Sequence, residues 1–192
     1  MSEPSAVDAN VGPVLFSAEQ IADRVTTLGS EIADHYADSV PIVVGILKGS
    51  SVFLSDLIRA IDIPLEVEFL SVSSYGASTR SSGLVRVGRD LDRNISGREV
   101  LLVEDIVDTG TTLAYLRNYF APFEPATIAA CSLLLRSSAE VHEQGPSDGE
   151  VADGHGLDYV GFKVTSDVFV VGYGLDHDQG YRNLPYIAEF LI

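Results

Sequence analysis

The stretch VLLVEDIVDTGTTL, from Val100 to Leu113, decides the fold of this chain. Its first four residues are apolar without a break, which is typical of a strand buried on both faces of a parallel sheet. Three carboxylates follow, at Glu104, Asp105 and Asp108, and after them come hydroxyl residues and a run that favours a helix. The pattern predicts a short central strand, an acidic turn and a helix start in one small volume.

The turn offers the groups that a sugar phosphate needs. Gly110 allows a tight turn, and the N–H groups around it can bind a phosphate at a helix N-terminus, where the helix dipole favours an anion. The hydroxyls of Thr109, Thr111 and Thr112 add donors, while the carboxylates suit ribose hydroxyls and a Mg²⁺ ion. The alternative is an ordinary loop with a solvated acidic turn and a threonine N-cap. The Walker A pattern GxxxxGK[ST] and the dinucleotide pattern GxGxxG are both absent.

Length and composition predict one globular α/β domain. The chain has 192 residues, of which 46% are hydrophobic and 21% charged, so a single well-packed core is expected. No apolar run reaches membrane-spanning length and the N-terminus lacks the features of a signal peptide, so we expect a cytoplasmic protein. The net charge of −16 disfavours nucleic acid and anionic membranes as partners. An acidic surface with only two lysines is equally compatible with a saline cytoplasm, GC-rich coding or chance.

Cysteine and histidine provide little chemistry in this sequence. Cys131 is the only cysteine and lies in an apolar run, which predicts a buried, unreactive thiol and excludes an internal disulfide. The four histidines are scattered along the chain, which argues against a zinc site.

The remaining chain predicts a helix and further strands around the central strand. Ser17 and Gln20 have the spacing of a capping box, so a helix is expected to begin there. Apolar or alternating runs predict strands over residues 41–47, 65–72, 84–87, 126–135 and 168–176. Residues 1–13 are expected to form a flexible tail and residues 137–156 an acidic surface insertion. The segment 73–83 is rich in small and hydroxyl residues, and we interpret it as a mobile lid beside the site.

The central stretch resembles the PRPP-binding motif of type I phosphoribosyltransferases, in which PRPP is 5-phosphoribosyl 1-diphosphate. Three further stretches are similar, in the same order, to the hypoxanthine-guanine branch of that family. They are Ile46-Leu47-Lys48-Gly49, which resembles the pyrophosphate loop; Ser74-Tyr75, which resembles the flexible catalytic loop; and VFVVGYGLDHDQGYRNLPY from Val168, which resembles the purine-binding segment. The resemblance implies a type I phosphoribosyltransferase fold, with a central parallel sheet flanked by helices and a small hood.

The resemblance also assigns a role to each matching residue. Glu104 and Asp105 would hold the ribose diol, Asp108 would take or share the purine N7 proton, and Thr109, Gly110, Thr111 and Thr112 would bind the 5′-phosphate. Leu47, Lys48, Gly49 and Arg182 would meet pyrophosphate, with a cis Leu47–Lys48 bond. Phe169 would stack on the purine and the backbone of Val170 would meet its edge, with Asp176 beside them. Glu104, Asp105 and Asp176 would hold Mg²⁺.

The implied reaction transfers the phosphoribosyl group of PRPP to N9 of hypoxanthine or guanine, giving the nucleoside monophosphate and pyrophosphate. One position departs from the family pattern, because Arg136 stands where a lysine usually reads the purine 6-oxo group, and the two cations differ in shape. A preference for xanthine or another base therefore stays open, and so does a PRPP-sensing regulator without catalysis. The family resemblance favours a homodimer or homotetramer.

Overall fold

The computed structural model describes residues 9–74, 85–89, 91, 93–137 and 156–191. Its body is a six-stranded sheet in the order β4-β3-β2-β5-β6-β7, parallel except for β4 at one edge. The strands are β2 (Ile42–Leu47), β3 (Glu66–Ser74), β4 (Val85–Arg89), β5 (Glu99–Val107), β6 (Thr127–Ser137) and β7 (Tyr159–Thr165). This topology confirms the predicted class, a central parallel sheet flanked by helices.

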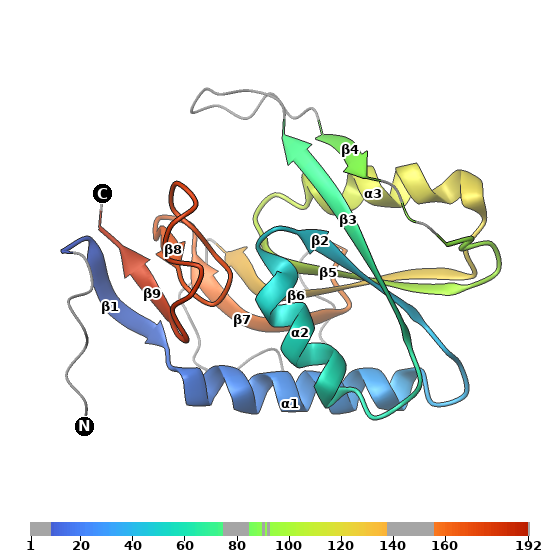
Figure 1. Cartoon of the computed structure of the whole chain (residues 1–192), viewed down its shortest axis with the longest axis horizontal. Coiled ribbons are helices and arrows are strands. Elements are labelled where there is room, and N and C mark those ends of the chain that lie inside the picture. Colours follow the sequence, from blue (N-terminus) through green and yellow to red (C-terminus); the bar gives the residue numbers. More distant parts are fainter. Residues whose placement is uncertain (1–8, 75–84, 90, 92, 138–155, 192) are drawn as a thin grey trace.

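Helices cover both faces of the sheet (Figure 1). They are α1 (Ala18–His35), α2 (Ser50–Ala60), α3 (Thr111–Phe120) and the short 3-10 helix η1 (Ala121–Phe123). Because strand side chains alternate, β5 contributes to two cores. Leu101 and Val103 pack in the cluster of α1 and α2, whereas Leu102 packs in the cluster of α3. All three side chains are fully buried.

Local sequence signals set the start and the buried face of α1. The predicted capping box is present, since Gln20 N–H donates to Ser17 Oγ at 3.2 Å and Ser17 N–H donates to Gln20 Oε1 at 2.8 Å. An apolar stripe at helical spacing faces the sheet, namely Ile21, Val25, Leu28 and Ile32. Arg24 also connects the helix to β7, because its guanidinium donates to the carbonyl oxygens of Val160 and Gly161.

A second, three-stranded antiparallel sheet forms the hood (Figure 1). Its order is β1-β9-β8, with β1 at Val11–Phe16, β9 at Ile187–Phe190 and β8 at Val170–Val171. The prediction of a tail over 1–13 is therefore wrong from Val11 onward, because pairing with β9 orders that segment. Residues 1–8 lie outside the described residues.

Three strand predictions need correction. β5 runs to Val107, so Glu104 and Asp105 lie in a strand and not in a turn, because pairing with β6 continues through Val107. The predicted strand over 168–176 is reduced to β8, since the backbone turns at Gly172 and Gly174, where φ is 100° and 99°. β7 was not among the predicted strands.

Two predicted loops fall largely outside the described residues. Ser73 and Ser74, at the start of the lid prediction, belong to β3, and the described chain resumes at Val85. Of the predicted insertion, the structure describes Ser137, the last residue of β6, and Gly156. The prediction of a mobile loop at Tyr75 therefore concerns a residue outside the described ones.

Two expectations about composition can be compared with the structure. Cys131 is fully buried, and burial raises the pKa of its thiol, so the thiol is protonated and shielded as predicted. Among the helices of the described ranges, none is long and apolar enough to cross a membrane.

Candidate active site at the divergence of two strands

The central strands β2 and β5 separate at their carboxyl ends. They pair with each other only as far as Gly45 and Val103. Beyond that point β2 continues beside β3, while β5 continues beside β6. The chain thus moves outward in opposite directions from β2 and β5, and open α/β sheets bind ligands at such a switch point.

A cavity of about 290 Å³ lies at this divergence. Its lining comes from β2 and the loop after it, from β5, from the start of α3 and from the hood segment. The lining residues are Ile46, Leu47, Lys48, Gly49, Val72, Glu104, Asp105, Ile106, Thr112, Asp176 and Arg182. Eight of the predicted site residues therefore share one cavity, although the sequence separates them by up to 135 positions.

Glu104 and Asp105 point to opposite faces of the end of β5. The Glu104 side chain lies on the same face of β5 as Leu102. Burial, together with the charge of Asp105, raises the pKa of Glu104 to about 8. The Asp105 side chain lies on the same face of β5 as Val103 and packs against Gly49. A Cβ added at Gly49 would lie 1.6 Å from Asp105 Oδ2. Burial raises the pKa of Asp105 to about 6, although hydrogen bonds from its own and the next N–H, and the charge of Arg182, oppose the shift.

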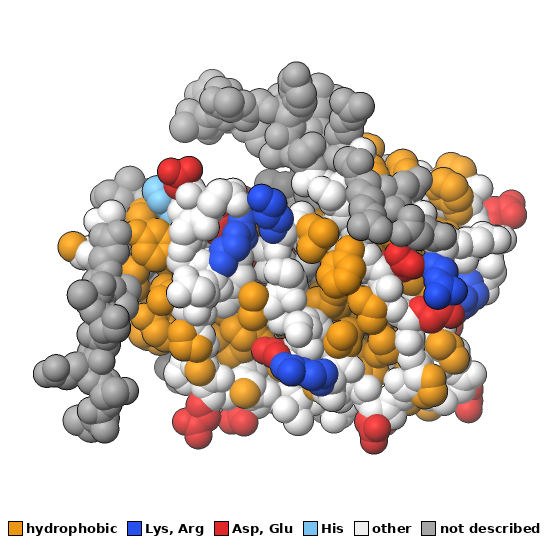
Figure 2. Space-filling model, in the orientation of Figure 1, with side chains coloured by type: hydrophobic (Ala, Val, Ile, Leu, Met, Phe, Trp, Pro, Cys, Tyr) orange, Lys and Arg blue, Asp and Glu red, His pale blue; other side chains and the backbone are white. Residues whose placement is uncertain are grey.

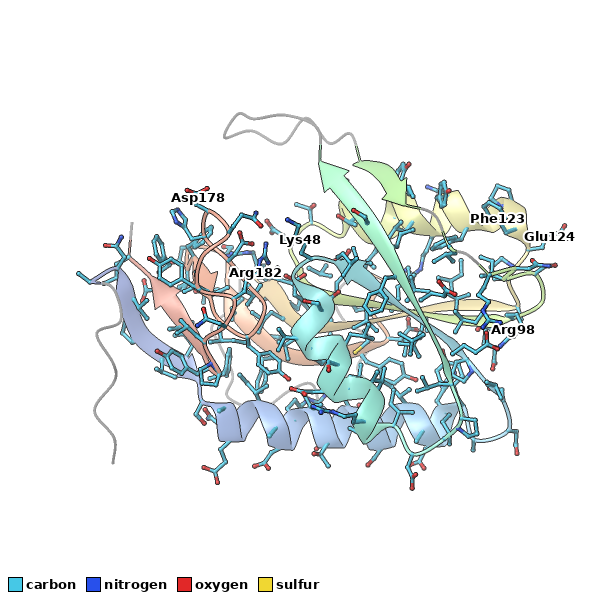
Figure 3. All side chains as sticks on the ribbon, viewed as in Figure 1. Lys48, Arg98, Phe123, Glu124, Asp178 and Arg182 are labelled. Atoms are coloured by element: carbon cyan, nitrogen blue, oxygen red, sulfur yellow. The ribbon has the colours of Figure 1, made fainter. Side chains whose placement is uncertain are left out.

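Two cations face the cavity from different parts of the chain. Lys48 follows β2 after a cis Leu47–Lys48 peptide bond, as predicted, and Arg182 comes from the hood segment. Figure 3 labels both side chains between α2 and the hood loops, and Figure 2 shows Lys and Arg side chains gathered at the middle of this face. The cavity therefore combines carboxylates with the cations that a pyrophosphate group needs.

Hydrogen bonds connect these cations to the hood loop. Lys48 Nζ donates to Gln179 Oε1 at 3.2 Å. Arg182 donates to the carbonyl of Gly174 at 2.6 Å and pairs with Asp176 Oδ1 at 2.6 Å. The second oxygen of Asp176 accepts the N–H of Gln179 at 2.9 Å. The loop thus holds both predicted pyrophosphate cations in place.

The predicted phosphate loop begins α3. Gly110 has φ 73°, a conformation that glycine adopts without strain, and no side chain caps the first turn of α3. Thr109 Oγ1 and Thr111 Oγ1 lie 2.8 Å apart, and Asp108 is exposed just before them. Uncapped N–H groups at a helix N-terminus form an anion-binding arrangement, so the loop fits a phosphate.

The predicted base site lies between β6 and the hood. Arg136 Nη1 donates to the carbonyl of Val168 at 2.6 Å, which places the arginine beside Phe169. Phe169 is 36% exposed as a residue, so part of it is accessible to a ligand, and Val170 pairs with Glu189 inside the hood. The structure brings Arg136, Phe169 and Val170 together at this place, although neither Arg136 nor Phe169 lines the cavity at the strand divergence.

Sequence reasoning missed several residues around the site. His177 stacks on Phe190 at 4.2 Å between ring centroids and lies edge to face with Phe169 at 5.6 Å. Gln179 bonds Lys48, and Arg117 shares a second cavity with the phosphate loop. His177 and Gln179 lie within the stretch that resembles the purine-binding segment but had no predicted role, and Arg117 lies outside the quoted motifs, so only contacts in the fold single these residues out.

The three predicted metal ligands are close to the same cavity but do not form a closed cage. In the part of the chain that the structure describes, no group of three or more His, Cys, Asp or Glu side chains could hold a metal ion by itself. Asp105 and Asp176 nevertheless line the same cavity, and the charge of Asp176 adds to the effect of burial in raising the pKa of Asp105. Mg²⁺ commonly uses one or two carboxylates together with substrate oxygens and water, so the donor set fits that ion.

The chain is similar in sequence to known phosphoribosyltransferases. A family model described as the phosphoribosyl transferase domain matches residues 15–178. The hypoxanthine-guanine phosphoribosyltransferase of Mycobacterium avium is 45% identical over 185 residues, covering 93% of this chain and 85% of the relative. The enzyme of the same name from Bacillus subtilis is 45% identical over 179 residues, covering 93% of each chain.

Solved structures agree with the sequence relatives. A hypoxanthine phosphoribosyltransferase from Staphylococcus aureus has a TM-score of 0.84 at 35% identity, covering 98% of this chain and 96% of that one. A hypoxanthine-guanine phosphoribosyltransferase from Bacillus anthracis has a TM-score of 0.81 at 36% identity, covering 94% and 99%. Because these matches span nearly the whole chain and agree with the geometry of the site, the protein belongs to the phosphoribosyltransferase family, among relatives named hypoxanthine-guanine phosphoribosyltransferases.

Proposed function

We propose that this protein is a purine salvage enzyme that transfers the phosphoribosyl group of PRPP to N9 of hypoxanthine or guanine. The products are the nucleoside 5′-monophosphate and pyrophosphate. The observation that carries the proposal is the divergence of β2 and β5, which brings a carboxylate pair, Thr112 of the phosphate loop and two cations around one cavity. Each group has the chemistry that suits one part of PRPP: carboxylates for the ribose hydroxyls, the loop for the 5′-phosphate and the cations for pyrophosphate.

The chain's own residues account for binding and orientation. The N–H groups at Gly110 and the first turn of α3 hold the 5′-phosphate, and Glu104 and Asp105 accept hydrogen bonds from the ribose hydroxyls. Lys48 and Arg182 bind the pyrophosphate that leaves. Because Glu104 and Asp105 have raised pKa values, binding of a cationic or hydroxyl-bearing ligand favours their ionised forms.

The reaction breaks the bond between the anomeric carbon and the pyrophosphate oxygen, whose electron pair leaves with pyrophosphate. N9 of the purine forms the new bond, and the purine loses one proton. Asp108 accepts or shares that proton at N7, since it is exposed between the diol carboxylates and the phosphate loop. The developing positive charge at the anomeric carbon is stabilised by the nearby carboxylates.

A bound Mg²⁺ would be held by Glu104, Asp105 and Asp176 together with substrate oxygens. When bound, it neutralises charge on the pyrophosphate group. Arg136 donates to the purine 6-oxo group with the N–H groups that Val168 does not use. Phe169 offers its exposed ring face to the base.

A base-incorporation assay tests the proposal. The purified protein is incubated with PRPP, Mg²⁺ and radiolabelled hypoxanthine, guanine, xanthine, adenine or uracil, and the labelled nucleotide is measured. We expect incorporation of hypoxanthine and guanine. Preference for xanthine would correct the base, and incorporation of no base at all would favour the PRPP-sensing alternative.

Two further predictions concern the surroundings of the site. We expect residues 75–83 to close over bound PRPP, so that PRPP with a non-reactive purine analogue protects this segment from protease; an unchanged cleavage rate would contradict a lid. We also expect a cytoplasmic homodimer or homotetramer, and sedimentation of the purified protein measures the oligomeric state.

A further inference from the structure

A second cavity, of about 510 Å³, is lined in part by the phosphate loop. One side is formed by Thr109, Gly110 and Thr111, and the other by residues that the proposed reaction does not use. Those residues are Ala114, Arg117, Asn118 and Gly156. The cation in this lining is Arg117, so a positive side chain shares a cavity with the predicted anion-binding backbone.

The position of Arg117 on α3 allows its side chain to approach the loop. Thr111 is the first residue of the helix and Arg117 follows it by six positions, which is about 9 Å along the axis. In the structure the guanidinium points the other way, toward the carbonyl of Ile128 near the beginning of β6, so it must turn toward the helix N-terminus to reach the loop. Long side chains on a helix lean in that direction, and an arginine covers most of that span. Ala114, one turn before Arg117, is small and leaves the path open.

The hydrogen bonds of Arg117 Nη2 are long and therefore weak. This atom lies 3.5 Å from the carbonyl oxygen of Ile128 and 3.5 Å from Asp158 Oδ2, whereas good N–H···O bonds measure about 2.7 to 3.2 Å. Asp158 Oδ2 already accepts a shorter bond, of 2.8 Å, from the N–H of Ala130. The side chain of Arg117 is 33% exposed. It can therefore exchange these contacts for a stronger one.

Gly156 leaves room for the Arg117 guanidinium, because it has no side chain. A Cβ built at this position would lie 2.1 Å from Arg117 Nη1, so a side chain there would displace the arginine. Gly156 also has φ 71°, a conformation that suits glycine. The backbone at this point thus accommodates the cation beside the cavity.

Electrostatics give this cation a use. The chain carries a net charge of −16 and its phosphate loop contains no lysine, yet PRPP is a polyanion. We propose that Arg117 is a substrate-binding residue, which donates a charge-assisted hydrogen bond to the 5′-phosphate of PRPP and of the product nucleotide. This inference rests on the proposed function, because it takes the loop at Gly110 as the 5′-phosphate site.

The ligands of this site differ in whether they carry a 5′-phosphate. PRPP and inosine 5′-monophosphate carry the 5′-phosphate, whereas pyrophosphate does not. Loss of Arg117 therefore weakens the first two ligands and leaves pyrophosphate unaffected. A purely structural arginine would change all three affinities in parallel with stability.

The test measures binding of PRPP, inosine 5′-monophosphate and pyrophosphate to wild type and to Arg117→Met. We expect about tenfold weaker binding of the two 5′-phosphate ligands, the scale of one hydrogen bond to a charged group, and unchanged pyrophosphate binding. Arg117→Lys should restore part of the affinity, because it keeps the charge but loses the fork geometry. The matched control is Arg59→Met, which removes an equal charge from a 72% exposed side chain on α2.

A second variant moves the affinity in the other direction. Asp158→Asn removes the carboxylate that competes for Arg117 but keeps an oxygen that can accept the Ala130 N–H. Binding of PRPP should become a few-fold tighter, an effect that a structural role for Arg117 does not produce.

The inference is overturned if Arg117→Met binds the 5′-phosphate ligands as wild type does, or if it loses pyrophosphate binding equally. The proposed function is tested separately by the wild-type protein. If wild type forms no nucleotide from PRPP and 6-oxopurines but Arg117→Met still binds 5′-phosphate ligands selectively more weakly, the proposed function fails and the role of Arg117 stands. If wild type binds no 5′-phosphate ligand, both are wrong.

Discussion

Replacing Gly49 by alanine should disable the site through one contact. The Cβ that alanine adds would lie 1.6 Å from Asp105 Oδ2 and 2.4 Å from its Cγ, while real Cβ atoms essentially never come within 3.0 Å of another heavy atom. The difference, 3.0 minus 1.6, means that the carboxylate must move by at least 1.4 Å. The backbone at Gly49 has φ −59°, which alanine adopts easily, so the clash is the whole effect.

The displacement has two measurable consequences. Overpacking of this kind destabilises a fold by about 1 to 3 kcal/mol. A shift of about 1 Å in a group that positions the substrate can lower a rate by about 10²-fold, so we expect kcat/KM for PRPP to fall by that factor. Denaturant unfolding measures the first effect and steady-state kinetics with hypoxanthine measures the second.

Two further variants identify the cause. In the double variant Gly49→Ala/Asp105→Ala the clash is absent. Its loss of unfolding free energy should therefore be smaller than the sum of the losses in the two single variants, by about 0.5 to 3 kcal/mol. Gly29→Ala is the control, because its added Cβ meets the backbone of Ala60 at 2.6 Å, away from the site. It should destabilise the fold and leave KM for PRPP unchanged. Full kcat/KM in Gly49→Ala, or strictly additive stability losses, would refute the reasoning.

Three other predictions concern single side chains. Asp108→Asn should lower kcat by about 10²-fold and leave PRPP binding intact, as expected for loss of a general acid or base, and an unchanged kcat would remove Asp108 from that role. Because burial raises the pKa of Glu104 from 4.5 to about 8, the folded protein holds an extra proton between these values, and unfolding free energy should fall as pH rises through this window, by up to about 1.4 kcal/mol per unit. Urea unfolding from pH 5 to 8 should show a shallower slope for Glu104→Gln than for wild type; equal slopes contradict the shift. Arg136→Lys should keep hypoxanthine as a substrate and change the ratio of hypoxanthine to xanthine use, whereas Arg136→Ala should weaken every oxopurine, and kcat/KM that is equal in all three proteins would show that Arg136 does not read the base.

Local signals explain which parts of the fold could be predicted from sequence. The capping box at Ser17 and Gln20 involves neighbouring residues, and so does the apolar stripe of α1, so both were readable. The buried strand β2 is a continuous apolar run and β6 is apolar from Ile128 to Leu135 except at Ser132, a pattern that burial on both faces produces.

Long-range pairing explains what the sequence did not reveal. Glu104 and Asp105 suggested a turn because carboxylates are unusual in a strand, but pairing of β5 with β6 carries the strand past them. β1 is ordered by β9, which lies at the other end of the chain. The predicted strand continued past Val171 to Asp176, but Gly172 and Gly174 permit the left-handed backbone with which the chain turns there.

The same distinction holds for the site. Motifs identified the carboxylates, the phosphate loop and the cis peptide because each lies within a few consecutive residues. The bond from Lys48 to Gln179 and the bond from Arg136 to the Val168 carbonyl join residues far apart in sequence. No local pattern encodes such contacts, so the partners of the site residues required the fold.

Because side chains alternate between the two faces of β5, this strand cannot gain or lose a single residue without changing the site. Glu104 and Asp105 face opposite sides of the sheet, one toward α3 and one toward Gly49. Deleting or inserting one residue between Val100 and Val103 would exchange the two faces and turn each carboxylate into the wrong layer. Variation in length among natural or engineered relatives should therefore be confined to the connections between elements, while β5 keeps a fixed count of residues from its first buried valine to its acidic pair.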